Sequence, residues 1–131
     1  MGGKMKEDKE NLRLLAIRGA TTLSKDEPNE IMEKTIELAN KMVEENSIEE
    51  EDIVNFIISV TQDIHSEFAG KFLRIRFPET PIFGTVEANV TNAPKMCIRI
   101  LLQCYSKKRK PQVNHIFLNE AMKLRPDLIK Q

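Results

Sequence analysis

Two arginines and one glutamate stand where the sequence predicts strands, and together these residue types could bind a small anion. Arg99 lies among apolar neighbours in the strand predicted for residues 95–105, and Arg18 ends the first predicted strand. A guanidinium on a largely buried sheet is costly unless it meets an anion. Glu87 lies in a weaker strand, where it could pair with either arginine or contact a ligand hydroxyl. Each of these residues alone is usually an ion-paired or solvated surface group. Their combination in one small sheet modestly favours an anion site.

Other charged residues are typical of solvated surfaces. Lys71 and Arg74 are three residues apart in the predicted helix 64–76, so they share one face, and Arg125 lies near the C-terminus. The basic run 107–110 has no aromatic residue between its charges. It is most simply a solvated turn between strands, which leaves nucleic-acid binding as a minor alternative.

The cysteines and histidines form no recognisable metal or nucleophile motif. Cys97 and Cys104 are seven residues apart in one predicted strand, which places them on opposite faces, too far apart to bridge. His65 and His115 lack the short ligand spacing of a zinc site. The sequence also contains no Gly-rich phosphate loop, Ser-His-Asp order or paired carboxylates. An enzyme with this sequence would therefore rely on positioned cations and hydrogen bonds, with no metal or cofactor.

The composition predicts a soluble, globular protein. Its 131 residues include 20 Lys+Arg and 20 Asp+Glu, a formal net charge of zero, and 40% are hydrophobic. Neutrality argues against a dedicated nucleic-acid binder, and no apolar run approaches the roughly 20 residues of a membrane span. The polar residues 1–11 predict a flexible leader rather than a signal peptide, followed by a single domain over residues 12–131. We therefore expect a cytoplasmic protein that binds neither nucleic acid nor membrane.

Hydrophobic periodicity predicts an α/β (α+β) fold, with a mixed sheet and two main helices on one of its faces. The longer helix is expected to run to about residue 46, because Ile31, Leu38 and Met42 recur at helical spacing. The first strand is expected to leave the sheet at the Gly and Thr residues of 19–22. Strands are predicted at 12–17, 53–60, 82–90, 95–105 and 113–118, helices at 28–46 and 64–76, and a helical turn with a tail at 120–131.

The alternation along the strongest predicted strand indicates an oligomer. One side is wholly apolar and suits a core beneath the helices, whereas the other side is mixed. A mixed face suits neither solvent nor a dry core, so packing against copies of itself in a closed homo-oligomer would bury it. The apolar side comprises Met96, Ile98, Ile100, Leu102 and Cys104, and the mixed side Cys97, Arg99, Leu101, Gln103 and Tyr105.

Four stretches of this sequence resemble, in order and spacing, those of the AroH-class chorismate mutases, the trimeric, monofunctional α/β type. They are residues 16–22 (AIRGATT), 59–65 (SVTQDIH), 97–99 (CIR) and 124–128 (LRPDL), and the similarity extends from about Leu14 to Leu128. The resemblance implies a pseudo-α/β-barrel homotrimer with its helices outside and its sheets facing inward. It also implies three active sites in clefts between neighbouring subunits.

This resemblance implies the pericyclic rearrangement of chorismate to prephenate in aromatic amino acid biosynthesis, within the shikimate pathway. Such a reaction needs no acid, base, metal or cofactor, because the enzyme holds the dianionic substrate compactly and stabilises the charge that grows on its ether oxygen. By matching position, Arg99 would contact that oxygen, Arg18 a carboxylate and Glu87 the ring hydroxyl. The other substrate-binding positions that the resemblance implies are Phe68, Lys71, Arg74, Phe117, Leu124 and Arg125.

Two positions depart from the family pattern. Phe117 stands where the family commonly has a tyrosine that reaches a carboxylate, and Gly84 stands where it commonly has a cysteine near the ring hydroxyl. Each lost polar contact would cost on the order of 1 kcal/mol of binding or transition-state stabilisation. These departures leave open a non-catalytic, dianion-binding trimer with a regulatory or scaffolding role. Similar trimers that deaminate imines are a third alternative, which the four stretches disfavour.

Overall fold

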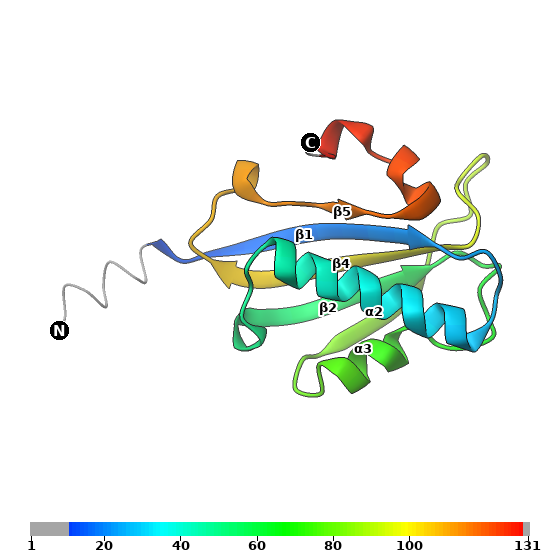
Figure 1. The fold of residues 1–131 in the computed structure, drawn as a ribbon, viewed down its shortest axis with the longest axis horizontal. Coiled ribbons are helices and arrows are strands. Elements are labelled where there is room, and N and C mark those ends of the chain that lie inside the picture. The colour runs from blue at the N-terminus through cyan, green and yellow to red at the C-terminus, as the bar shows by residue number, and fades with distance from the viewer. Residues whose placement is uncertain (1–10, 130–131) are drawn as a thin grey trace.

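The computed structural model describes residues 11–129, which form a five-stranded sheet covered by two α-helices (Figure 1). The strand order is β3-β2-β4-β1-β5. The flexible leader expected at residues 1–11 lies outside the described residues except for residue 11, and residues 130–131 of the expected tail also lie outside them. In chain order the elements are β1 (Arg13–Thr22), α2 (Pro28–Glu45), η1 (Glu50–Asp52), β2 (Ile53–Val60), α3 (Gly70–Arg76), β3 (Ile82–Val86), β4 (Cys97–Ser106), η2 (Lys110–Gln112), β5 (Ile116–Phe117), η3 (Asn119–Lys123) and η4 (Pro126–Leu128).

The central strand β4 pairs antiparallel with both of its neighbours, β1 and β2. The edge strands run parallel to the strands beside them, β3 to β2 and β5 to β1. Both α-helices pack on one face of this sheet (Figure 1). The predicted fold class, a mixed sheet with two main helices on one face, is confirmed.

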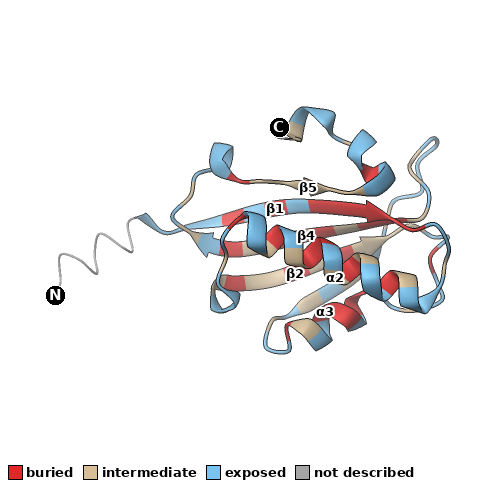
Figure 2. Cartoon of the chain, viewed as in Figure 1, coloured by how far each residue is buried: buried red, intermediate tan, exposed pale blue. Residues whose placement is uncertain are grey.

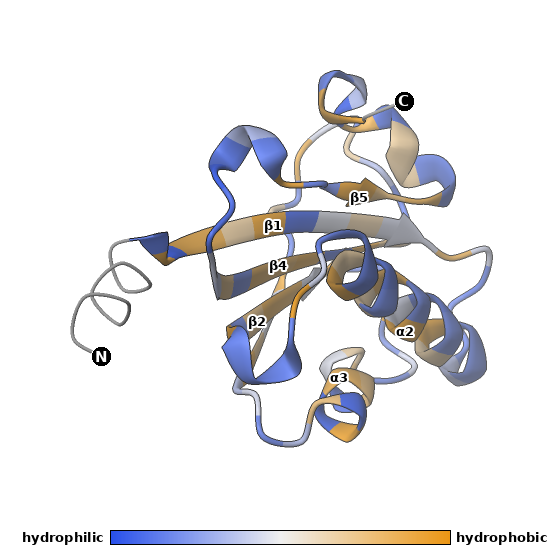
Figure 3. Cartoon of the chain, turned by 60° about the vertical axis from the view of Figure 1, so that its left-hand side comes forward, coloured by the Kyte–Doolittle hydropathy of each residue, from blue (hydrophilic) through white to orange (hydrophobic). Residues whose placement is uncertain are grey.

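The long helix α2 forms because an apolar stripe recurs along it at helical spacing and packs on the sheet. Ile31, Leu38 and Met42 are fully buried, whereas the outer side of the helix is hydrophilic (Figure 3). Pro28 begins the helix, at a position where its missing N–H is not needed for helical hydrogen bonding. No helix within residues 11–129 is long and apolar enough to cross a membrane.

The first strand is longer than predicted. Residues 19–22 stay in the sheet, because they pair in register with residues 97–100 of β4. The expectation that Gly19 helps to end the strand was wrong, because the strand continues past it and its Cα packs closely against α2. The two edge strands β3 and β5 are shorter than predicted.

The second helix begins later than predicted, at Gly70 rather than at residue 64. Before it, the backbone N–H groups of His65 and Ser66 donate to the carboxylate of Asp26 at 3.1 and 3.0 Å. Partial desolvation acts to raise the pKa of Asp26, but the hydrogen bonds from Ser66 and His65 outweigh it and lower that pKa. This contact between distant parts of the chain holds residues 64–69 in a turn instead of a helix.

β2 contains a β-bulge near its start. Ile53 pairs with Cys104, but the next paired residue, Asn55, lies opposite Gln103, so Val54 stands outside the register. Beyond the bulge, the pairing with β4 is regular to the end of β2. The bulge therefore sets which residues of β2 lie opposite which residues of β4.

The helix-covered face of the sheet holds the main hydrophobic core, and the buried residues of α2 alternate with exposed ones along the helix (Figure 2). The opposite face carries a small buried cluster of Ala20, Cys97 and Ala121 at one end. In β4 the residues predicted to face the helices, from Ile98 to Cys104 at alternate positions, are at most 2% exposed. On the opposite, open face, Tyr105 of β4 is 52% exposed and Leu14 of β1 is 53% exposed. The predicted apolar side of β4 is confirmed from Ile98 to Cys104, whereas Met96 lies before the strand and Cys97, predicted on the mixed side, is fully buried.

Candidate active site

Four residues lie in one row across the sheet, and this row is the centre of the candidate site. Arg99 of β4 pairs with Ser59 of β2 on one side and with Ala20 of β1 on the other. Ala20 in turn pairs with Phe117 of β5. The register of four strands therefore brings together residues that are far apart in the sequence.

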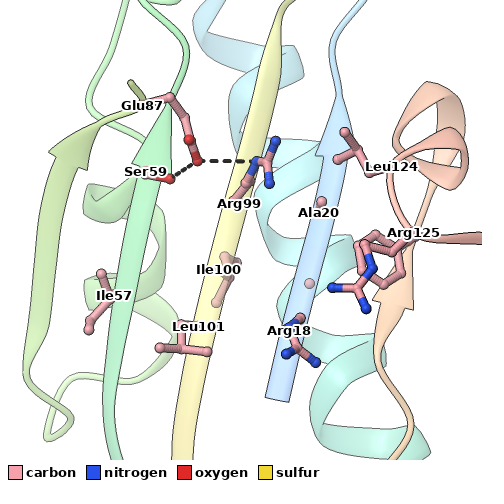
Figure 4. A pocket seen from close by; sticks show the side chains of 12 residues that line it. Arg18, Ala20, Ile57, Ser59, Glu87, Arg99, Ile100, Leu101, Leu124 and Arg125 are labelled. Carbon is pink, nitrogen blue, oxygen red and sulfur yellow. Dashed lines mark hydrogen bonds and ion pairs between the residues drawn. The ribbon is translucent and has the colours of Figure 1, made fainter. Parts of the chain in front are cut away.

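A cavity of about 430 Å³ opens on the same face of the sheet (Figure 4). This volume suits a small-molecule ligand. Three arginines and one glutamate line the cavity, so its charge is predominantly positive. The lining residues are Arg18, Gly19, Ala20, Ile57, Ser59, Glu87, Arg99, Ile100, Leu101, Phe117, Leu124 and Arg125.

Glu87, Arg99 and Ser59 form a connected group at one end of the cavity (Figure 4). Nε of Arg99 lies 3.2 Å from Oε1 of Glu87, an ion pair that lacks hydrogen-bond geometry. Oγ of Ser59 donates a hydrogen bond to the same glutamate oxygen. Nε of Arg99 is buried although the side chain as a whole is 43% exposed, and the Nη atoms point away from Glu87 over the sheet. The Nη groups of Arg99 are therefore directed to where a ligand could reach them.

Cys97 lies two residues before Arg99 and is buried as a free thiol. Burial raises the pKa of this thiol, and the positive charge of Arg99 offsets only part of that effect. The thiol therefore stays protonated near neutral pH, so no thiolate neutralises the guanidinium beside it. The positive charge of Arg99 is left for Glu87 and for an anionic ligand.

Arg18 is held at the other end of the cavity by His115. The backbone N–H of Arg18 donates to Nδ1 of His115 at 2.9 Å, and Nη1 of the same arginine lies 3.2 Å from Nε2. A neutral imidazole that accepts at Nδ1 carries its hydrogen at Nε2. Nη1 of Arg18 then finds no acceptor at Nε2, so His115 fixes the backbone of Arg18 and does not take up the hydrogen-bond donors of its guanidinium.

The segment after β5 brings Leu124 and Arg125 to the rim of the cavity. The side-chain amide of Asn119 donates to Oγ1 of Thr21 at 2.9 Å, and the backbone N–H of Glu120 donates to Oγ1 of Thr22 at 3.1 Å. These bonds attach η3 to the end of β1. Beyond η3, the guanidinium of Arg125 donates to Asp127 at 3.0 and 2.9 Å, and these hydrogen bonds lower the pKa of that carboxyl.

Three of the residues implied by the resemblance, Phe68, Lys71 and Arg74, do not line this cavity. They belong to α3 or the turn before it, beside the β3 edge of the sheet (Figure 1). Nζ of Lys71 lies 3.3 Å from a carboxylate oxygen of Glu67. The ring of Phe68 covers Gly84, where a Cβ would stand 2.3 Å from a ring carbon, so within one chain Phe68 fills the space of the missing side chain.

The structure brings together most of the predicted positions, and it adds one that sequence reasoning did not single out. Arg18, Glu87, Arg99, Phe117, Leu124 and Arg125 all line the cavity, as the resemblance led us to expect. Ser59 was not predicted as a site residue, although it begins one of the four resembling stretches. Ser59 is one of two polar residues on the mostly apolar strand 53–60, the other being Asn55, and this was the available signal.

Comparison with known proteins identifies the family. The family model of chorismate mutase type I matches residues 14–128, which is nearly all of the described chain. The chain belongs to the type I chorismate mutases. It is 35% identical over 119 residues to chorismate mutase AroH of Bacillus subtilis (strain 168), across 89% of this chain and 94% of that protein. It is 36% identical over 114 residues to chorismate mutase AroH of Thermus thermophilus, across 86% of this chain and 93% of that protein.

A solved chorismate mutase structure has the same fold as this type I chorismate mutase. Chorismate mutase from Clostridium thermocellum superimposes with a TM-score of 0.80 at 34% identity, covering 83% of this chain and 98% of that chain. Residues 14–128, which the family model matches, include every residue that lines the cavity. The predicted family is therefore confirmed.

Proposed function

We propose that this type I chorismate mutase converts chorismate to prephenate in the cavity around Arg99, as a cytoplasmic, cofactor-free enzyme of aromatic amino acid biosynthesis. The observation that carries the proposal is the pairing of Arg99 with Glu87 inside a cavity lined by two further arginines. Chorismate is a dianion with a ring hydroxyl, so it offers carboxylates to guanidinium groups and a donor to the glutamate.

The rearrangement is intramolecular: one C–O bond breaks as one C–C bond forms, and no group has to be added or removed. Negative charge grows on the ether oxygen as the C–O bond breaks, so the Nη groups of Arg99 would stabilise the transition state more than the bound substrate. Arg18 and Arg125 would hold the carboxylates and keep the substrate in its compact conformer. Glu87 would accept the hydrogen bond of the ring hydroxyl through Oε2, to which no hydrogen bond is found within residues 11–129.

We also propose that the active enzyme is a homotrimer in which a neighbouring subunit supplies Phe68, Lys71 and Arg74 to each cavity. The open face of the sheet and the β3 edge support this proposal, because they leave large apolar side chains exposed. Ile75 is 68% exposed and Phe83 is 67% exposed. A second copy would cover these side chains and close the cavity against water.

A turnover assay tests the proposed reaction. Purified protein should consume chorismate, followed by the loss of its ultraviolet absorbance, with prephenate as the product. Arg99→Ala should lower kcat by about 100- to 1,000-fold, the usual loss when one oxyanion donor is removed, while the subunit stoichiometry from light scattering stays unchanged. Wild-type kcat in Arg99→Ala would overturn the assigned role of Arg99, and a wild-type chain without turnover would overturn the function.

Subunit mixing tests the shared site. Arg99→Ala and Arg74→Ala trimers should each have low activity, because every cleft lacks one cation. After dissociation and reassembly together, some clefts would pair an intact Arg99 with an intact Arg74, so activity should reappear. If the mixture stays as inactive as its two components, Arg74 does not act across subunits.

Phe117 favours a second candidate function, a trimer that binds dianions without catalysis. Its ring lines the cavity but carries no hydroxyl for a substrate carboxylate. This alternative predicts that prephenate raises the melting temperature of the protein although chorismate is not consumed. Turnover of chorismate would dispose of it.

A further inference from the structure

The hydroxyl of Ser59 and the guanidinium of Arg99 both contact a single oxygen of Glu87. Oγ of Ser59 donates to Oε1, and Nε of Arg99 lies 3.2 Å from the same atom. Ser59 lies directly opposite Arg99 in the β2–β4 register. The backbone N–H of Glu87 donates to the carbonyl of Val60 at 2.9 Å, so the start of the glutamate side chain is also fixed to β2.

This arrangement fixes the rotation of the Glu87 carboxylate. Oε1 is engaged by two partners, whereas no hydrogen bond to Oε2 is found within residues 11–129. Glu87 is only 23% exposed, so water does not surround the group freely. A carboxylate held in this way presents one oxygen to a ligand donor and keeps the other for the protein.

The same arrangement prevents Glu87 from forming a bidentate pair with Arg99. Arginine and a carboxylate prefer a bidentate pair, with two parallel N–H donors on two oxygens. Without the bond from Ser59, Glu87 could turn both oxygens toward Arg99 and take up an Nη group. That Nη group would then be withdrawn from the ligand, and Oε2 would be taken up by Arg99.

We propose that Ser59 is a positioning residue that acts through Glu87, keeping Oε2 of Glu87 and the Nη groups of Arg99 free for the substrate. This inference rests on the proposed function, because it assigns Ser59 a part in the same reaction. Ser59 touches Glu87 and lines the cavity, but it carries no charge and its bond is directed at the glutamate. Its contribution is therefore to the geometry of two charged groups that the transition state needs.

Kinetics of Ser59→Ala test the proposal in the full-length chain. We expect kcat to fall about tenfold, the effect of one hydrogen bond of about 1.4 kcal/mol, with a smaller change in KM, because ground-state binding through the other arginines remains. Ser59→Thr keeps the hydroxyl and should restore most of the lost activity. Ser106→Ala is the matched control, because it removes a hydrogen-bonded serine hydroxyl at the far end of β4 and should leave kcat unchanged.

A double-mutant comparison distinguishes action through Glu87 from a general structural effect. In a Glu87→Ala background, assayed at high enzyme concentration, Ser59→Ala should cause no further loss of kcat. An equal loss in both backgrounds, or wild-type kcat in Ser59→Ala, would overturn the inference while leaving the proposed function standing. A wild-type chain that does not consume chorismate would overturn the proposed function itself.

Discussion

The Cα of Gly19 lies against the sulfur of Met42, so close that a Cβ at position 19 would stand 2.3 Å from Sδ. Met42 is fully buried in α2, so its thioether can shift only within the packed core. Glycine at this position therefore lets the long helix approach β1 between Arg18 and Ala20. The helix contact and the cavity are on opposite faces of the same three residues.

Gly19→Ala should destabilise the fold by about 1–3 kcal/mol, the usual cost of forcing an extra methyl into a packed core. Urea unfolding measures the change. Gly70→Ala is the matched control: a Cβ there would stand 2.4 Å from the ring of Phe68, but that ring is 50% exposed and can swing away. Equal losses in the two variants would contradict the argument that the buried Met42 yields less readily than the half-exposed ring of Phe68.

Phe117→Tyr should raise kcat/KM, by up to about tenfold if the new hydroxyl makes one good hydrogen bond of about 1 kcal/mol or slightly more. Phe117 lies in the row with Arg99 and lines the cavity, so the hydroxyl would enter the site. A fall in kcat/KM for Phe117→Tyr would mean that the hydroxyl meets no partner there.

Asn119→Ala should raise KM severalfold while changing kcat little. Asn119 has a φ of 56°, which alanine adopts only with strain, and its amide donates to the buried Thr21. Its loss would loosen η3 and with it the position of Arg125 at the rim. Steady-state kinetics separate the two parameters, and Lys123→Ala on the same element is the control. An unchanged KM would show that the Thr22 bond alone secures η3.

Glu30→Gln should lower stability at neutral pH and lose that effect in acid. The side-chain hydrogen bond from Ser24 is the largest influence on Glu30 and holds its pKa below the ordinary 4.5, against partial desolvation. A carboxyl with a lowered folded-state pKa stabilises the fold above its ordinary pKa, and this contribution disappears as the pH falls through the folded value. Unfolding free energies of the two proteins should therefore converge on acidification below pH 4.5. If the difference in unfolding free energy persisted in acid, the charge of the Glu30 carboxylate would not be its cause. Glu33→Gln, at an exposed position on the same helix, is the control for general charge effects.

The elements that sequence predicted best are those whose signals are local. The bounds of β2 were predicted correctly, because a β-branched run is flanked by acidic residues on one side and a polar turn on the other. The second helix was misplaced because Ile64 and Phe68 lie at helical spacing, while the Asp26 carboxylate that keeps this segment in a turn is far away in sequence. The role of Gly19 was predicted wrongly because a glycine is needed there to make room for α2, which packs on this part of β1.

In the candidate site too, residues with a local sequence signal were predictable, and contacts between distant residues were not. Arg18 and Arg99 were predictable because a charge within an apolar strand is unusual in the sequence itself. The bond from Ser59 to Glu87 depends on which residue of β2 lies opposite Arg99, and periodicity gives no register between strands. The contact of His115 with Arg18 likewise depends on the pairing of β5 with β1.

The bulge at Val54 determines which side chains of β2 face the cavity and which face the helices. Side chains of a strand alternate between two faces, so one residue left out of the ladder exchanges the faces of all that follow. Were Val54 paired in the ladder, Ser59 would turn toward the helices and its apolar neighbours would enter the cavity. Pairing Val54 with Gln103 would therefore shift every later residue of β2 by one position along β4 and turn its side chain to the opposite face of the sheet.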